Sequence, residues 1–414
     1  MARQNEIVQN YGLKEELFQA AVAARASDIH VDPTANALVI RFRIDGILKT
    51  WLEADISEHE SLVSQFKAIA ELDLARHSKP QGGHFVWLPA DASNTIQKSG
   101  GRQRVLDVRI SIFPTVFGEA AVMRIFNRPD ILMDMKDLGM AQPDFDLLWR
   151  LVTLSHGMVL VTGPTSAGKT TTIYSILQTL AGTNQNIITL EDPVEYYLDK
   201  VRQSQISPEH GYTYAEGIKS ILRQDPDTIM VGEIRDFETA ENAFRTSLTG
   251  RLVLSTLHVN DSIGTISRLL DMQVERSMLA YALKGVVNQR LVGRICEHCK
   301  GTYTPPAEVL SALGIATGEQ FFRGKGCAQC GDTGFFQRVA LFEVLPIDEV
   351  IQRMVISNVP ISEIRALLVE RKFKTLHDDG IEKIRQGLTT PEEVLKQTSA
   401  LVVQTGPVRG PRDI

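Results

Sequence analysis

The sequence predicts an α/β protein in which an N-terminal α+β domain precedes a larger domain built on a parallel sheet. Two observations carry this prediction. In the second part of the chain, short apolar segments alternate with helical patterns, which is typical of a parallel sheet that binds ligands at the carboxyl ends of its strands. In the first part, strand-like segments follow one another with a tight turn between two of them. A chain of 414 residues is long enough for two main domains.

The N-terminal domain is expected to cover residues 1–128. Apolar residues between Leu13 and Ala24 recur near one helical face and predict a helix. The segment 37–44 then predicts a strand, and Asp45–Gly46 provides the turn into a second strand. The remaining elements are expected in this order: the returning strand over 47–52, a helix over 57–74, an exposed loop or hairpin over 91–104, and strands over 106–113 and 121–126.

A linker is expected over 129–140, because the strand pattern stops near Asn127. The second domain should occupy 141–400, beginning with a helix over 143–153. Its apolar strands are predicted over 158–161, 187–190, 228–231 and 252–257, each ending beside polar residues. The last residues, 401–414, are expected to form a flexible tail.

The composition is that of a soluble globular protein with a formal charge of −6, which disfavours a nucleic-acid partner. No apolar stretch approaches the roughly 20 residues that cross a bilayer. The polar start of the chain lacks the apolar core of a secretory signal. We therefore expect a cytoplasmic protein.

The four cysteines form two C-x-x-C pairs, which in a reducing compartment favours metal ligation over disulfides. Two such pairs can supply four thiolates to one tetrahedral Zn²⁺. His298 could also ligate, but four cysteines already fill the coordination shell. The alternatives are four unligated thiols or a disulfide. We predict a structural zinc site in a subdomain over 290–345, with the ligands Cys296, Cys299, Cys327 and Cys330.

A phosphate-binding loop follows the strand over 158–161 and precedes a helical pattern. Backbone N–H groups of such a loop surround phosphate oxygens, and the positive end of the helix points at them. The lysine would reach the β- and γ-phosphates, and the following threonine would ligate Mg²⁺. A glycine-rich turn without a nucleotide is the alternative. The loop consists of Gly163, Pro164, Thr165, Ser166, Ala167, Gly168, Lys169 and Thr170, and Thr171 begins the helix.

Three polar clusters stand at the ends of the strands that follow the loop. Residues 191–195 hold carboxylates that could orient or deprotonate a water attacking the γ-phosphate, unless they form only a solvated acidic turn. Glu233 ends an apolar strand and is the natural partner of Thr170 on the Mg²⁺ side. His258 ends another strand and could donate to the γ-phosphate, although a lone histidine is more often structural.

The order and the amino-acid sequences of these segments resemble those of the secretion ATPases that power type II secretion and type IV pilus assembly. Four segments are similar to that family's Walker A, Asp box, Walker B and His box, namely 158–172, 190–196, 222–236 and 249–258. The resemblance also includes residues 26–30, 42–46, 107–111, 114–119 and 389–395, so it extends over nearly the whole chain.

The resemblance implies a PAS-like N-terminal domain, a RecA-like ATPase domain and specific roles for several residues. Glu195 becomes the water-activating carboxylate, Glu233 the Walker B acid and His258 the γ-phosphate sensor. Family members form hexameric rings in which N-terminal arginines complete the nucleotide site, and Arg109 and Arg124 match those positions. They could also be ordinary strand-surface arginines. Arg223 matches a further family arginine, whereas Lys219, one helical turn earlier, replaces an arginine and loses its bidentate fork.

The tetracysteine element resembles the secretion and assembly branch of the family rather than its retraction motors. The expected function is therefore an ATP-hydrolysing hexameric motor that uses ATP, Mg²⁺ and Zn²⁺. Its expected partners are a polytopic inner-membrane platform protein and a cytoplasmic docking protein, which place it on the cytoplasmic side of the inner membrane. The region before residues 26–30 is too short for the additional recruitment domain that many family members carry there, so the docking mode stays open. A nucleotide-regulated scaffold and a RecA-like nucleic-acid translocase are the alternatives.

Overall fold

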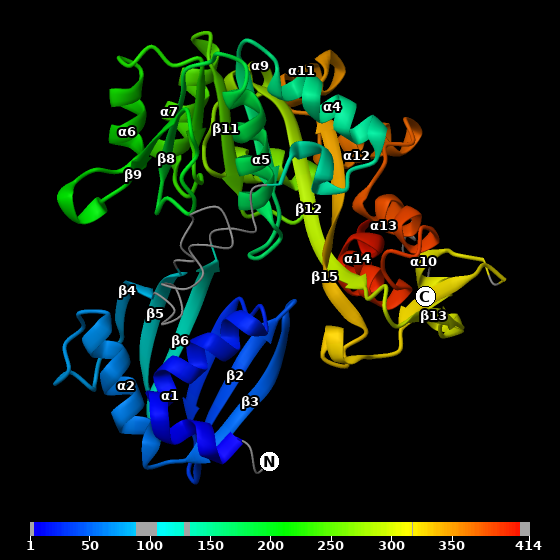
Figure 1. Cartoon of the computed structure of the whole chain (residues 1–414). Helices are drawn as coiled ribbons and strands as arrows, with labels where there is room; N and C mark the ends of the chain where they lie inside the picture. The colour runs from blue at the N-terminus through cyan, green and yellow to red at the C-terminus, as the bar shows by residue number, and fades with distance from the viewer. Residues whose placement is uncertain (1–3, 88–105, 128–132, 317, 406–414) are drawn as a thin grey trace, which may run out of the picture. The chain divides into compact units, whose positions relative to one another are not determined.

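The computed structural model describes residues 4–87, 106–127, 133–316 and 318–405 (Figure 1). The chain divides into two compact units, residues 1–131 and 132–414. The loop or hairpin predicted over 91–104 lies outside the described residues. Within the expected linker, Asp134 caps a short 3₁₀ turn, η1 (Met135–Leu138).

The first unit is an antiparallel sheet with two helices packed on it. Its six strands follow the order β3-β2-β1-β6-β5-β4. The ring of Phe18 contacts the rings of Phe66, Phe85 and Trp87, with centroids 5.5 to 6.1 Å apart. These contacts bury both helices against the sheet. The elements are α1 (Gln4–Ala23), β1 (Asp28–Pro33), β2 (Ala37–Ile44), β3 (Ile47–Asp55), α2 (Glu58–Ile69), β4 (Gln81–Trp87), β5 (Leu106–Thr115) and β6 (Gly118–Asn127).

Helix α2 ends at Ile69, so the predicted helix over 57–74 is too long at its C-terminal end. Glu71 takes a left-handed φ of 55°, which does not continue a right-handed helix. The carboxylate of Asp73 then accepts the backbone N–H of Ala75 at 3.0 Å and forms a turn. Local turn chemistry therefore overrides the apolar periodicity of this segment.

The second unit is built on a seven-stranded sheet with the order β15-β12-β7-β11-β10-β8-β9. All neighbouring pairs are parallel except β12 with β15. The predicted strands over 228–231 and 252–257 are present at those bounds as β10 and β11. The strands are β7 (Gly157–Thr162), β8 (Ile187–Glu191), β9 (Val201–Gln205), β10 (Thr228–Val231), β11 (Leu252–Leu257), β12 (Leu283–Ile295) and β15 (Phe335–Pro346).

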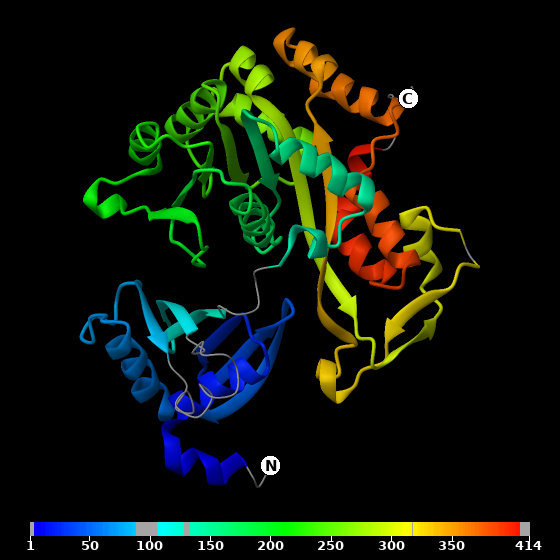
Figure 2. The same ribbon diagram turned by 45° about the horizontal axis from the view of Figure 1, so that its top comes forward.

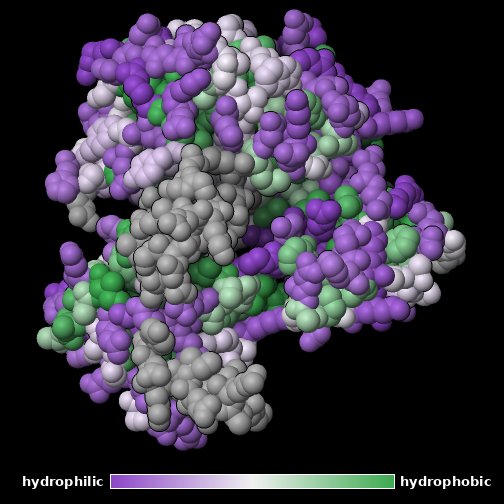
Figure 3. Space-filling model, in the orientation of Figure 1, coloured by the Kyte–Doolittle hydropathy of each residue, from purple (hydrophilic) through white to green (hydrophobic). Residues whose placement is uncertain are grey.

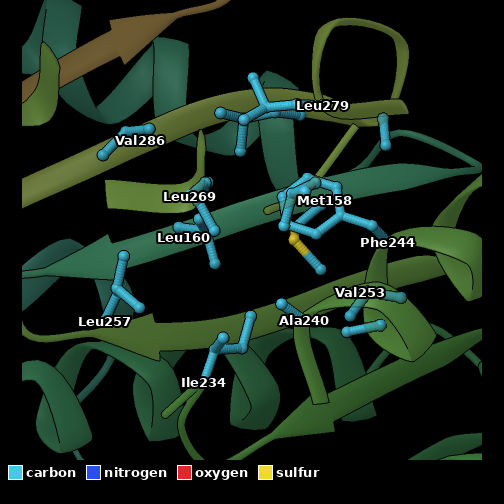
Figure 4. Packing of buried hydrophobic residues seen from close by; sticks show 14 of the residues in the cluster. Met158, Leu160, Ile234, Ala240, Phe244, Val253, Leu257, Leu269, Leu279 and Val286 are labelled. Carbon is cyan, nitrogen blue, oxygen red and sulfur yellow. The ribbon is translucent and has the colours of Figure 1, made fainter. Parts of the chain in front are cut away.

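Helices cover both faces of this sheet. Met158 and Leu160 of β7 belong to one core with Phe244 and Leu269 (Figure 4). This core also includes residues of α6 (Tyr214–Ile221), α7 (Phe237–Leu248), α8 (Ser262–Asp271) and α9 (Arg276–Ala282). Because side chains alternate along a strand, the neighbours of Met158 and Leu160 face the other side. There α5 (Lys169–Ala181) packs on β7 and α4 (Gln142–Val152) packs on β12 and β15.

The long strands β12 and β15 continue beyond the sheet and carry the tetracysteine element (Figure 2). That element contains β13 (Lys300–Tyr303), α10 (Ala307–Leu313), β14 (Phe321–Gly324) and the 3₁₀ turn η3 (Ala328–Cys330). The chain ends with α11 (Glu349–Ile356), α12 (Ile361–Glu370), α13 (Leu376–Arg385) and α14 (Pro391–Thr405). Helix α14 thus enters the segment 401–414, whose residues 406–414 lie outside the described part.

The face of the second unit seen in Figure 3 is mostly hydrophilic. Among the described residues, no helix combines the length and the apolar character that a membrane span requires.

Candidate functional site

The phosphate loop turns between β7 and α5 through residues that few side chains allow. Gly163, Ser166 and Gly168 have φ angles of 148°, 63° and 87°. A Cβ atom on Gly163 would lie 2.5 Å from the carbonyl oxygen of Gln289, so glycine is required there. Backbone N–H groups in such a turn, at the N-terminus of a helix, form a concave site for anions.

Lys169 is the first residue of α5, and its ammonium points back into this loop. Its Nζ atom donates to the carbonyl oxygens of Gly163 and Pro164, both at 2.9 Å. The side chain is buried, and this desolvation lowers the pKa of Lys169 to about 8, although Glu233 opposes the shift. A phosphate in the loop would add the negative charge that stabilises the ammonium form.

His258 and Glu233 meet Lys169 because β11 pairs with β7 and β10 pairs with β11, so the three strands end at the same edge of the sheet. Nδ1 of His258 accepts a hydrogen bond from Nζ of Lys169 at 3.4 Å. Desolvation and the charge of Lys169 lower the pKa of His258, so the ring is neutral at neutral pH. Its proton then sits on Nε2, which lies 3.8 Å from Oε2 of Glu233. The other carboxylate oxygen of Glu233 pairs with Arg235.

Thr170 and Glu233 fit the expected magnesium site by the chemistry of their donors. Thr170 lies in the first turn of α5, and Glu233 is 17% exposed at the carboxyl edge of the sheet. A hydroxyl and a carboxylate are oxygen ligands that Mg²⁺ prefers, and phosphates and water complete the shell. When bound, the ion neutralises charge that develops on the transferred phosphoryl group.

Glu195 lies in the segment between β8 and β9, and its backbone is tied to α5. Its N–H donates to the hydroxyl of Tyr174 at 3.2 Å. Tyr174 is one helical turn beyond Thr170, so the segment is fixed to the helix that begins at the phosphate loop.

The other predicted nucleotide contacts lie on other elements of the chain. Arg223 follows α6, and its Nη1 atom donates to the carbonyl oxygen of Lys219 at 3.5 Å. Arg109 and Arg124 stand opposite each other on β5 and β6 of the first unit. Arg124 also pairs with Asp28 at 3.0 Å.

Strand β12 contributes three site residues that sequence reasoning missed. Asn288 donates to the hydroxyl of Thr162 at 2.8 Å, and Arg290 donates to the carbonyl oxygen of Asn260 at 2.7 Å. Gln289 donates to the carbonyl oxygen of Ala167 at 2.7 Å and accepts from the hydroxyl of Thr172 at 2.8 Å. This strand therefore holds both the phosphate loop and the loop after His258. Arg290 lies in the main sheet, although residues 290–345 were expected to form the tetracysteine subdomain.

The four cysteine sulfurs have the spacing of one tetrahedral metal site. All four lie within 4.8 Å of one another. The pairs Cys296–Cys327, Cys299–Cys330 and Cys327–Cys330 are separated by 3.8, 3.8 and 3.7 Å. Ligands about 2.3 Å from a tetrahedral Zn²⁺ are about 3.8 Å apart, so the residues fit the ion.

The backbone around Cys330 favours the thiolate that a metal requires. Desolvation raises the pKa of this thiol, but the N–H groups of Gly334 and Cys327, together with the thiols of Cys327 and Cys299, lower it to about 6. The two N–H groups donate to Sγ at 3.3 and 3.2 Å. Hydrogen bonds of this kind orient metal ligands.

The chain matches known proteins over nearly its whole length. The family described as "Type II/IV secretion system protein" matches residues 3–396. The type IV pilus assembly ATPase PilB of Thermus thermophilus is 39% identical over 390 residues, which are 93% of this chain and 42% of that protein. The type II secretion system protein E of Dickeya dadantii is 39% identical over 382 residues, which are 92% of this chain and 74% of that protein.

Solved structures share the fold. The pilus retraction motor PilT with bound ADP has a TM-score of 0.60 at 25% identity, covering 92% of this chain and 96% of PilT. The ATPase DotB of Legionella pneumophila has a TM-score of 0.67 at 20% identity and covers 95% of both chains. These neighbours and the structure confirm the predicted α/β fold with an N-terminal domain before an ATPase domain. The chain belongs to the type II/IV secretion system protein family, together with the ATPases of type II secretion and type IV pilus assembly.

Proposed function

We propose that this chain hydrolyses ATP to drive assembly of a type IV pilus or of a type II secretion pseudopilus. The type IV pilus of a conjugation system falls within this proposal. The observation that carries the proposal is the meeting of Lys169, Glu233 and His258 behind the phosphate loop. Family membership supports it, because the matched relatives include pilus assembly and secretion ATPases.

In the proposed reaction, Lys169 holds the β- and γ-phosphates, and Thr170 with Glu233 holds Mg²⁺. A water oxygen bonds to the γ-phosphorus, the bond to the bridging oxygen breaks, and the carboxylate of Glu195 positions the water and takes its proton. His258 would respond when the γ-phosphate leaves, and its contact with Lys169 and its approach to Glu233 support this role.

The proposed motor is a homohexamer at the cytoplasmic side of the inner membrane. Arg109 and Arg124 would approach the nucleotide from the N-terminal unit of the same or a neighbouring copy and stabilise charge on the phosphoryl group. Opening and closing of the units would move a polytopic platform protein, with a cytoplasmic docking protein as a further partner.

Loss of the phosphate-binding ammonium or of the Walker B carboxylate should abolish turnover. We expect Mg²⁺-dependent ATPase activity to fall at least about 100-fold in both variants. Lys169→Ala removes a cation at the phosphates, and Glu233→Ala removes a ligand of the Mg²⁺ that would neutralise them. Phosphate release is the measurement, and circular dichroism shows whether the variants fold. Arg251→Ala, a half-buried residue immediately before β11 and at the opposite end of that strand from His258, is the matched control. Intact turnover in both site variants would contradict the proposal.

A nucleotide-regulated scaffold is the alternative within the same machine. Lys169, Glu233 and His258 meet at the phosphate loop, which favours an enzyme over a scaffold. A single-turnover hydrolysis assay separates the two functions. A nucleic-acid translocase is disfavoured by the formal charge of −6, and strong stimulation of the ATPase by DNA would support it instead.

A further inference from the structure

The hydroxyl of Tyr174 joins helix α5 to the segment that carries Glu195. Tyr174 is only 1% exposed, and its hydroxyl donates to Oε2 of Glu191. The same oxygen accepts the backbone N–H groups of Glu195 at 3.2 Å and Tyr196 at 3.4 Å. One phenol therefore fixes two consecutive peptide groups at the position of the proposed water-activating residue.

Glu191 is the anchor of this arrangement. It is 3% exposed, and its Oε1 atom accepts from the hydroxyl of Thr189 at 2.5 Å and from Nε2 of Gln203 at 3.0 Å. The amide of Gln203 also donates to the carbonyl oxygen of Tyr196 at 2.7 Å. Both oxygens of Glu191 are thus engaged by side chains of α5, β8 and β9, so Glu191 and Glu195 have different tasks.

We propose that Tyr174 is a positioning residue for Glu195 and that Glu191 orients its hydroxyl. This inference rests on the proposed function, in which Glu195 activates the attacking water. Tyr174 and Thr170 are one turn apart on α5, so the helix that receives the phosphates also sets the place of the carboxylate. Desolvation and the charge of Glu191 raise the pKa of Tyr174 far above its usual value, so the phenol keeps its proton.

A positioning role changes the rate of the chemical step rather than the binding of ATP. A small displacement of a catalytic group can cost about 100-fold in rate, so we expect Tyr174→Phe to lower kcat about 10- to 100-fold. KM for ATP and the affinity for a non-hydrolysable analogue should stay within about threefold, because no phosphate ligand changes. Tyr281→Phe, on α9 and 57% exposed, is the matched control and should leave both constants unchanged.

A double-mutant cycle tests whether Tyr174 acts through Glu195. Tyr174→Phe, Glu195→Gln and the double variant are compared by single-turnover hydrolysis, with thermal unfolding as the check on folding. The loss caused by Tyr174→Phe should disappear when Glu195 is already Gln, since residues that act as a unit are not additive. Glu191→Gln, which keeps the volume and the hydrogen-bonding shape, should show the same pattern with a smaller loss and serves if Tyr174→Phe fails to fold.

The outcomes separate this inference from the proposed function. Full turnover in Glu195→Gln would refute the proposed role of Glu195, and the inference with it. If Glu195→Gln is inactive while Tyr174→Phe keeps its kcat, or if the two losses multiply, the proposed reaction stands and the positioning role is wrong.

Discussion

At the level of single residues, the site depends on a lysine whose charge is only partly stabilised by the protein. Lys169 is buried and donates to carbonyl oxygens of its own loop, and its charge also lowers the pKa of His258. A group in this condition responds strongly to an added anion, because phosphate oxygens are better counter-ions than peptide carbonyls. The same condition makes nucleotide binding sensitive to pH.

ATP affinity should fall as the pH rises above about 8. The pKa of Lys169 is lowered from 10.5 to about 8, so the ammonium predominates below that pH and the neutral amine above it. Since phosphate binding needs the ammonium, the Kd of a non-hydrolysable ATP analogue should about double between pH 7 and 8 and then increase up to about tenfold per pH unit. Calorimetric titration from pH 7 to 9.5 measures this.

Lys169→Met is the control for this pH dependence. The variant should bind weakly at every pH and show no change above pH 8, because the titrating group is absent. A wild-type Kd that stays constant up to pH 9.5 would contradict the expected titration of Lys169.

Residues were predictable from the sequence where a local motif carries the chemistry. Lys169 lies in a fixed pattern of glycines, and Glu233 and His258 end apolar strands, so the ends of three neighbouring strands bring them together. Asn288, Gln289 and Arg290 follow no such motif, and their roles depend on the pairing of β12 with β7. Tyr174 looks like an ordinary buried aromatic residue until the partners of its hydroxyl are known.

At the level of elements, the tetracysteine unit depends on long-range pairing of the strands that support it. Cys296 follows β12, and Cys330 lies just before β15, so the antiparallel pairing of these strands brings the two C-x-x-C turns face to face. The periodicity of the sequence indicated the apolar strands of the parallel sheet but neither β12 nor β15. Both strands run from the main sheet into the tetracysteine element. The residues that surround them therefore change from those of the sheet to those of the metal site.

Removing one thiol should remove the metal and destabilise this element. We expect one Zn²⁺ per chain by elemental analysis, and less than about 0.2 in Cys296→Ser, because three thiolates bind zinc far more weakly. The unfolding temperature should fall by about 5 °C or more, since metal binding contributes directly to folding.

His298→Ala is the matched control for the zinc site, because it alters the same turn and leaves the four thiols intact. It should retain the metal and the unfolding temperature. Wild-type protein purified without chelator and found free of zinc would show that the cluster is not a zinc site.

At the level of the whole molecule, the nucleotide site described in the second unit draws its residues from the ends of β7, β8, β10 and β11, from the middle of β12 and from helix α5. Two of the predicted arginines, Arg109 and Arg124, belong to the first unit, where Arg124 already pairs with Asp28. A ring of identical subunits could complete each site with arginines from a neighbour, since head-to-tail contacts generate closed rings. Arg124 is either a structural arginine on the strand surface or a contributor to the nucleotide site. The two roles predict different ATPase activities for rings assembled from two different variants.

Two inactive variants should restore activity when mixed if the arginine acts between subunits. Lys169→Ala supplies intact arginines with an inactive site, and Arg124→Ala supplies an intact site without its arginine. In randomly mixed rings at equal amounts, about a quarter of the sites combine a working Lys169 with a neighbour's Arg124, so activity should approach that fraction of wild type. ATPase rates are measured after the variants are mixed under conditions that allow subunit exchange.

Mixing Lys169→Ala with Glu233→Ala is the control, because both changes affect the same subunit's site and no combination restores it. If Arg124→Ala is inactive alone and is not rescued by mixing, the arginine acts within its own subunit. If Arg124→Ala is active, the only role of Arg124 that remains is its ion pair with Asp28.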